Sequence, residues 1–170
     1  GACNHRCNFC AVDYIGYQNR FLDSEILMNR LVEMGQLGIR SVMFAGEGEP
    51  LLHKELPAII QQTCDIGIDV AVTTNAIPLT EKWAREALSS VTWVKVSINA
   101  GTPQTYARIH GTREQDFKLA VNNDFHSAAP HQRKLNEQKC RADKIILRCD
   151  INLTAHPTST RVAGAFYRRS

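Results

Sequence analysis

The chain has 170 residues, 44% of them hydrophobic, and a formal net charge of +3. This length favours one globular domain with a real core, and no apolar run is long enough to form a transmembrane helix. From Asn122 onward nine Lys and Arg stand against four Asp and Glu, so the preceding residues carry a net −2. We therefore expect no membrane partner and no nucleic-acid platform in the main body.

Half of the six cysteines lie within the first ten residues, in the pattern CxxxCxxC: Cys3, Cys7 and Cys10. The other three are scattered along the chain, and no secretory signal is visible. A clustered triplet of this kind is typical of metal binding in a reducing compartment rather than of a disulfide framework. The cysteines therefore predict a metal site and a cytoplasmic protein.

Three thiolates on one short loop match a [4Fe-4S] cluster that keeps one iron open for a small molecule. Zinc is the competing interpretation, because zinc also accepts four cysteines or three cysteines and a histidine. His5 is a poor fourth zinc ligand, since it sits inside the first cysteine spacing. We interpret the loop as an iron–sulfur site.

After the cysteine loop the chain alternates between helical and strand patterns. In chain order, we expect a helix over 23–37, a buried strand over 39–45, a helix over 54–65, a strand over 68–74, a helix over 80–88 and a strand over 91–99. This order implies a parallel sheet with right-handed crossovers, in which ligands bind at the carboxyl ends of the strands. The polar segments that follow the strands lie at those ends: Gly46–Pro50, Asn75, and Ser97 with Asn99.

The pattern weakens in the last third of the chain. A helix over 117–125 ends before Pro130, and a strand is expected over 144–153. We predict a core domain over residues 1–121 and a basic tail over 122–170. Truncation or an altered reading frame is one hypothesis for the change in pattern, and the coding DNA would test it.

Several short segments together resemble the radical S-adenosylmethionine (SAM) superfamily. Cys3, Cys7 and Cys10 match the cluster ligands of that family. Gly48, Glu49 and Pro50 in AGEGEPLLH are similar to its GGEP motif, which receives the methionine amino group of SAM. The first glycine of that motif corresponds either to Glu47 or to Gly46.

Three further segments carry the same resemblance. Ser97 and Asn99 in VKVSINAG are similar to positions that contact the ribose and carboxylate of SAM. Asn75 in TTNA resembles the strand end of the branch that includes the molybdenum-cofactor cyclase and the SPASM enzymes, and the backbone around Phe9 corresponds to a segment near the adenine.

The resemblance implies a partial (β/α) barrel, with its first strand before Gly1 and its later units degenerate. It implies an enzyme, or a fragment of one, that cleaves SAM reductively with a [4Fe-4S] cluster. The resulting 5′-deoxyadenosyl radical would abstract hydrogen from an unknown substrate, with flavodoxin or ferredoxin as reductant. No catalytic residue is assigned beyond the cluster. The alternative is a non-catalytic module that binds zinc or an iron–sulfur cluster and serves as an interaction scaffold.

Overall fold

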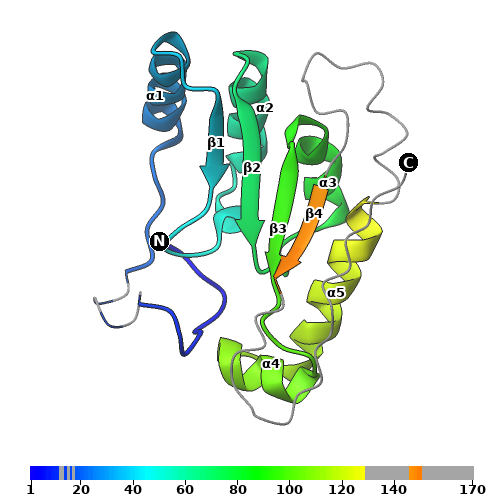
Figure 1. The fold of residues 1–170 in the computed structure, drawn as a ribbon. Helices are drawn as coiled ribbons and strands as arrows, with labels where there is room; N and C mark the ends of the chain where they lie inside the picture. The colour runs from blue at the N-terminus through cyan, green and yellow to red at the C-terminus, as the bar shows by residue number, and fades with distance from the viewer. Residues whose placement is uncertain (12–13, 15, 17, 129–145, 151–170) are drawn as a thin grey trace.

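The computed structural model describes residues 1–11, 14, 16, 18–128 and 146–150 (Figure 1). The helices are α1 (Ser24–Gln36), α2 (Leu56–Asp65), α3 (Glu81–Ala87), α4 (Pro103–His110) and α5 (Glu114–Ala128), with short 3-10 helices η1 (Pro50–Leu52) and η2 (Leu88–Ser90). The strands are β1 (Ser41–Phe44), β2 (Asp69–Thr74), β3 (Trp93–Ser97) and β4 (Ile146–Asp150). Within the described residues, no helix combines the length and apolar character that crossing a membrane requires.

The four strands form one parallel sheet in the order β1-β2-β3-β4. Figure 1 shows all four arrowheads pointing to the same end of the molecule, where α4 and the N-terminal segment also lie. The expectation of an α/β fold with a parallel sheet is therefore confirmed. β4 belongs to the C-terminal third, and it extends the sheet by pairing with β3 from Trp93↔Ile146 to Ser97↔Asp150.

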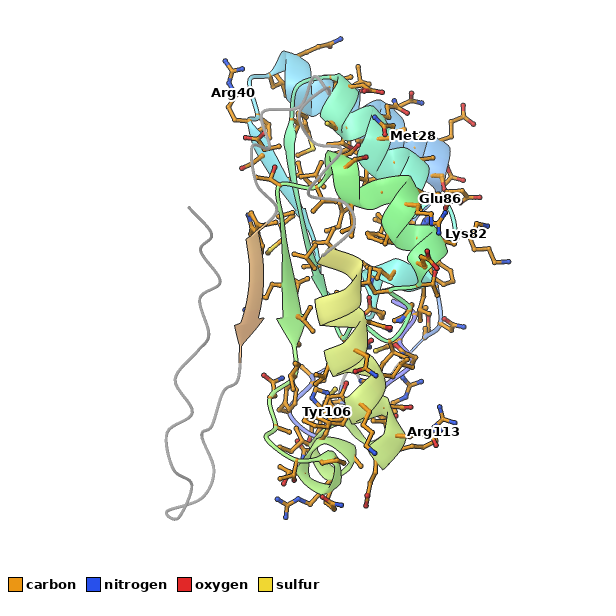
Figure 2. The ribbon with its side chains drawn as sticks, turned by 90° about the vertical axis from the view of Figure 1, so that its right-hand side faces the viewer. Met28, Arg40, Lys82, Glu86, Tyr106 and Arg113 are labelled. Atoms are coloured by element: carbon orange, nitrogen blue, oxygen red, sulfur yellow. The ribbon has the colours of Figure 1, made fainter. Side chains whose placement is uncertain are left out.

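The helices α1, α2, α3 and α5 lie on one face of the sheet (Figure 2). The strands bury alternate side chains against them, as the period of two along a strand requires. Val70 and Val72 of β2 and Val94 and Val96 of β3 are at most 1% exposed and form the centre of the core. Each such side chain stabilises the fold by roughly 1.5–3 kcal/mol relative to an exposed position.

Local signals set the start of three helices. Asp23, Thr80 and Thr102 each accept a hydrogen bond from the backbone N–H three residues later, which caps α1, α3 and α4. The predicted helix starts at Asp23 and Thr80 are confirmed. The second helix begins at Leu56 rather than at Lys54, and Pro57 stands in its first turn, where the missing N–H of proline is tolerated.

The first strand is shorter and more exposed than predicted. A buried strand over 39–45 is wrong: β1 covers four residues, and Ser41 and Met43 on it are exposed. β1 is an edge strand of the described sheet; its alternate residues Val42 and Phe44 are half-buried, and Phe44 packs against the core. Its short apolar run therefore did not indicate burial on both faces.

Candidate functional site

The cysteine loop lies across the carboxyl ends of the strands and closes a cavity of about 160 Å³. The cavity is lined by all three clustered cysteines and by six of the seven predicted cofactor residues: Phe9, Gly46, Gly48, Glu49, Asn75 and Ser97. His5, Arg6, Thr73, Thr74 and His110 complete the lining. The sheet thus brings together segments that are up to about a hundred residues apart in the sequence.

Backbone hydrogen bonds hold the loop in place at both ends. The N–H of Glu49 donates to the carbonyl of Ala2 at 2.7 Å. At the other end, the N–H groups of Arg6 and Asn8 donate to the carbonyls of His110 and Ile109 at 3.0 and 2.9 Å. These two carbonyls belong to the last turn of α4, where the helix itself supplies no donor. The loop therefore supplies the hydrogen-bond donors that the C-terminal end of α4 lacks, and the same hydrogen bonds hold the loop in position.

Two glycines permit this close approach. A Cβ on Gly48 would lie 2.3 Å from the carbonyl oxygen of Ala2, and one on Gly111 would lie 2.3 Å from that of Arg6. Both residues also have a positive φ, of 127° and 57°, which favours glycine. Gly48 belongs to the predicted Gly-Glu-Pro segment, whereas nothing in the sequence pointed to Gly111 as a contact of the loop.

The carboxylate of Glu49 is buried at the floor of the cavity, and only 4% of the residue is exposed. Its Oε1 accepts hydrogen bonds from the hydroxyl of Thr74 and the N–H of Leu51, at 2.6 and 3.1 Å. Its Oε2 accepts one from the N–H of Asn75 at 2.7 Å. Burial raises the pKa of Glu49, and these three hydrogen bonds oppose the shift. Glu49 therefore joins the turn after β1 to the end of β2.

Asn75 connects the end of β2 to the cysteine loop. Its Nδ2 donates to Oδ1 of Asn4 at 2.8 Å, and its Oδ1 accepts from the N–H of Ile77 at 3.0 Å. The side chain thus closes the strand and also orients the loop between the first two cysteines. Ser97, at the end of β3, faces the same cavity.

Asn99 is the predicted cofactor residue that does not line the cavity. The prediction placed it on the same face as Ser97 by strand alternation. β3 ends at Ser97, and Asn99 has a left-handed φ of 51°, so the alternation does not extend to it.

The donor set fits an iron–sulfur cluster. Cys3, Cys7 and Cys10 carry thiols, are half-buried and line one cavity. Burial raises the pKa of the Cys3 thiol, although the backbone N–H of His5 and the Arg6 cation oppose the shift. Soft sulfur ligands converging on one space are the arrangement that iron–sulfur clusters require. A buried carboxylate beside them complements a cationic ligand group.

Sequence reasoning missed a buried aromatic cluster beneath the cysteine loop, formed by His5, Tyr106 and His110. The three residues are at most 3% exposed, and Figure 2 places Tyr106 beyond the carboxyl ends of the strands. The Tyr106 and His110 rings lie 4.2 Å apart, and the His5 ring lies 5.4 Å from that of His110. The helical spacing of Tyr106 and His110 could have indicated a shared face of α4, but nothing local pointed to His5.

Comparison with known proteins places these residues in a family. The model of the "Radical SAM superfamily" matches residues 1–123. An S-adenosylmethionine-dependent nucleotide dehydratase of Lacinutrix mariniflava is 29% identical over 103 residues, which cover 58% of this chain and 21% of that protein. A GTP 3′,8-cyclase of Psychromonas ingrahamii is 35% identical over 118 residues, which cover 64% of this chain and 33% of that protein. The matched segment thus spans about a fifth to a third of these curated relatives.

Solved structures show the same fold. A structure of TYW1 with a lysine-pyruvate adduct bound aligns with a TM-score of 0.57 at 18% identity, over 91% of this chain and 63% of that chain. BtrN in complex with AdoMet and 2-DOIA aligns with a TM-score of 0.51 at 20% identity, over 90% of this chain and 55% of that chain. These likenesses support the predicted partial barrel.

The family match confirms the expected cofactors, a [4Fe-4S] cluster and SAM, and it favours an enzyme over a non-catalytic scaffold. The relatives named as GTP 3′,8-cyclases also agree with the predicted branch. The match covers well over half of the chain, and the chain therefore belongs to the radical SAM superfamily.

Proposed function

We propose that this chain forms the cluster- and SAM-binding part of a radical SAM enzyme. Cys3, Cys7 and Cys10 hold the cluster, and the adjoining cavity receives SAM. The observation that carries the proposal is that three half-buried thiols and the buried Glu49 carboxylate line one cavity at the carboxyl ends of the strands. Bound there, the cluster and SAM supply one-electron cleavage of a C–S bond and abstraction of hydrogen from a substrate.

Different residues of the cavity suit different groups of SAM, which carries an ammonium group, a carboxylate and a sulfonium. An ionised carboxylate offers about four lone-pair positions, and Glu49 uses three of them within the protein. The remaining position suits an ammonium donor. Gly46 leaves its backbone accessible to the ligand, because it presents no side chain and no atom lies within 4 Å of where a Cβ would stand. Gly48 also lines the cavity, but the space beside its Cα is taken by the Ala2 carbonyl of the cysteine loop.

The polar residues at the other strand ends complete the proposed ligand contacts. The hydroxyl of Ser97 can donate to or accept from a sugar hydroxyl. Phe9 is 58% exposed at the cavity, so its backbone and ring are available to an adenine. Asn75 and Asn99 are further proposed contacts; Asn75 already orients Asn4, and Asn99 follows β3 in a left-handed conformation and is not among the residues that line the cavity.

The one-electron chemistry requires an external donor. We propose a small electron carrier of the flavodoxin or ferredoxin class and a reducing compartment such as the cytoplasm, where three clustered thiols persist. We also propose residues 1–121 as the core domain and 122–170 as a basic segment that follows it; α5 runs across this boundary, and β4 adds a strand to the sheet of the core.

Anaerobic reconstitution with iron and sulfide tests the proposal. The chain should bind about four irons per polypeptide, and the electron paramagnetic resonance spectrum of the reduced cluster should change when SAM is added. Dithionite should then yield 5′-deoxyadenosine. Cys7→Ala should prevent cluster assembly while the far-ultraviolet circular dichroism stays unchanged. A cluster whose spectrum is indifferent to SAM would contradict the proposal, and so would wild-type iron content in Cys7→Ala.

A further inference from the structure

The imidazole of His110 contacts the thiol of Cys7 through one ring nitrogen and a backbone carbonyl through the other. Nδ1 of His110 lies 3.1 Å from Sγ of Cys7, and Nε2 lies 2.8 Å from the carbonyl oxygen of Ile98. A carbonyl oxygen only accepts hydrogen bonds, so Nε2 carries the proton and Nδ1 presents its lone pair toward the sulfur. This is the arrangement of a metal-binding histidine, whose second nitrogen donates to a backbone carbonyl that fixes the tautomer and the ring orientation.

His5 supplies a second nitrogen donor at the same place. Only 3% of the residue is exposed, and neither ring nitrogen has a hydrogen-bond partner among the residues that the structure describes. Burying an imidazole without hydrogen bonds destabilises the fold, so an unpartnered histidine at a cavity wall indicates that a ligand completes it. The donor atoms of His5, Cys7 and His110 all lie within 4.8 Å of one another.

We propose that His5, Cys7 and His110 form a metal site of their own, which binds a single zinc ion when the chain carries no iron–sulfur cluster. Two imidazole nitrogens and one thiolate are donors that zinc prefers, and a water molecule can take the fourth position. Binding releases the thiol proton of Cys7 to solvent, whereas both histidines bind in the neutral form.

The separations between the three donor atoms are near those of a zinc site, so small movements would suffice to bind the ion. Donors of a tetrahedral zinc ion with bonds of about 2.0–2.3 Å lie roughly 3.3–3.6 Å apart. The 3.1 Å separation of Cys7 and His110 is slightly shorter than this, and the 4.8 Å upper limit of the set is about 1 Å too long. Since Cys7 and His110 are already in contact, movement of the His5 ring toward this pair would bring the three donors into range.

The two metal centres share one sulfur. Cys7 is the middle ligand proposed for the cluster, so a zinc ion on His5, Cys7 and His110 occupies a thiolate that the cluster needs. Cys3 and Cys10 take no part in the zinc site. Zinc should therefore compete with cluster assembly, and the two centres should respond differently to substitution.

Zinc titration of the anaerobic, chelator-treated, cluster-free full chain tests the proposal against a chromophoric chelator. Cobalt(II) serves as a second probe, because a thiolate ligand gives a cobalt charge-transfer absorption. One zinc should bind per chain. The double substitution Cys3→Ser/Cys10→Ser should retain zinc affinity but lose the cluster, and Cys7→Ser should lose both. A zinc site that needs Cys3 and Cys10 would overturn the proposal, as would a wild-type chain that binds no zinc.

The histidines provide the sharper test. His5→Leu and His110→Gln should each weaken zinc affinity by more than about 100-fold, because each removes a direct ligand, and loss of an outer partner alone reduces metal affinity by roughly 10–100-fold. His5→Leu should still assemble a cluster, because it replaces an unpartnered imidazole with an apolar side chain. His53→Gln is the matched control, since His53 is a half-buried histidine that lies 2.9 Å from the carbonyl of Leu22 and should leave zinc binding unchanged. Wild-type zinc affinity in His5→Leu would refute the site.

Competition gives a readout with its own folding control, because His5→Leu must fold in order to incorporate iron. One equivalent of zinc added before reconstitution should lower iron incorporation in the wild type but not in His5→Leu. Equal inhibition in both would contradict the proposal. The result is separable from the proposed function, because a cluster that ignores SAM would leave the zinc data intact, and absence of zinc binding would leave a SAM-responsive cluster intact.

Discussion

The backbone N–H of Arg6 donates a hydrogen bond of 3.0 Å to the carbonyl of His110. The two residues are far apart in sequence, yet this bond and the neighbouring one from Asn8 to Ile109 attach the cysteine loop to the last turn of α4. The position of the three sulfurs therefore depends on how α4 ends, and α4 ends at Gly111 in a left-handed conformation.

Gly111→Ala should loosen the cysteine loop. The new Cβ would lie 2.3 Å from the Arg6 carbonyl oxygen, in addition to the strain of a left-handed alanine. The strain alone costs about 1–2 kcal/mol, and the overlap should add roughly 1–3 kcal/mol. Gly67→Ala is the matched control, because Gly67 also has a positive φ of 84° but meets no atom within 4 Å. Urea unfolding should show a larger loss for Gly111→Ala, and iron incorporation should fall only in that variant. Equal losses of stability in Gly111→Ala and Gly67→Ala would show that the overlap with the Arg6 carbonyl adds no cost beyond the backbone strain.

Glu49→Gln should weaken both the fold and SAM binding. The amide cannot accept hydrogen bonds at both terminal atoms, so one of the donors on Thr74, Leu51 or Asn75 loses its partner. An unsatisfied buried donor costs about 1–3 kcal/mol, which thermal unfolding would detect.

Thr74→Val separates the two effects of Glu49. It removes one hydrogen bond to the carboxylate but keeps the negative charge. Thr74→Val should therefore lose stability and retain most of its SAM affinity, as measured by the SAM-dependent spectral change of the cluster. A normal SAM response in Glu49→Gln would argue against an ammonium contact at this carboxylate.

Ser97→Ala should leave the cluster intact and weaken SAM binding. Ser97 lines the cavity and is not one of the proposed cluster ligands. A neutral hydrogen bond contributes about 0.5–1.5 kcal/mol, or up to about 10-fold in affinity. SAM titration of the reconstituted chain measures the effect, and iron content provides the internal control. Unaltered SAM affinity in Ser97→Ala would show that the Ser97 hydroxyl does not contact SAM.

Asp116 should make stability depend on pH in the acidic range. Its carboxylate is buried and accepts hydrogen bonds from Thr112 and Arg113. Burial alone would raise the pKa of Asp116, but these hydrogen bonds outweigh it and lower the pKa below its usual 3.8. The stabilisation is thus present above that pH and is lost as the pH falls through the lower, folded-state pKa.

Asp116→Asn should accordingly destabilise the chain by about 1–2 kcal/mol at pH 7, and the difference from wild type should shrink toward pH 3. Urea unfolding across this range measures it. Asp69→Asn, at an exposed carboxyl group, is the control and should change little at either pH. A constant deficit for Asp116→Asn at all pH values would show that packing, not ionisation, is responsible.

Features that depend on residues close together in the chain could be predicted from the sequence. Asp23 and Thr80 start their helices because a side-chain oxygen meets a donor three residues later. The cavity residues were predictable because parallel strands end at one edge, which brings Glu49, Asn75 and Ser97 together.

What could not be predicted depends on distant partners. His110 reaches Cys7 across 103 positions, and only the packing of α4 under the loop creates that contact. The exposure of Met43 on β1 likewise depends on which faces of the sheet the helices cover. Asn99 departs from the predicted face because the chain leaves β3 through a left-handed residue.

The way in which the loop is attached has a consequence for its variability. Main-chain groups of Ala2, Arg6 and Asn8 make the bonds that hold it, and main-chain groups are the same in every amino acid except proline. Asn8 contributes its main-chain N–H to these bonds, so most other residues could replace it without displacing the sulfurs. Asn4 and Arg6 also form hydrogen bonds through their side chains, and His5 is buried, so the loop tolerates less change at these three positions.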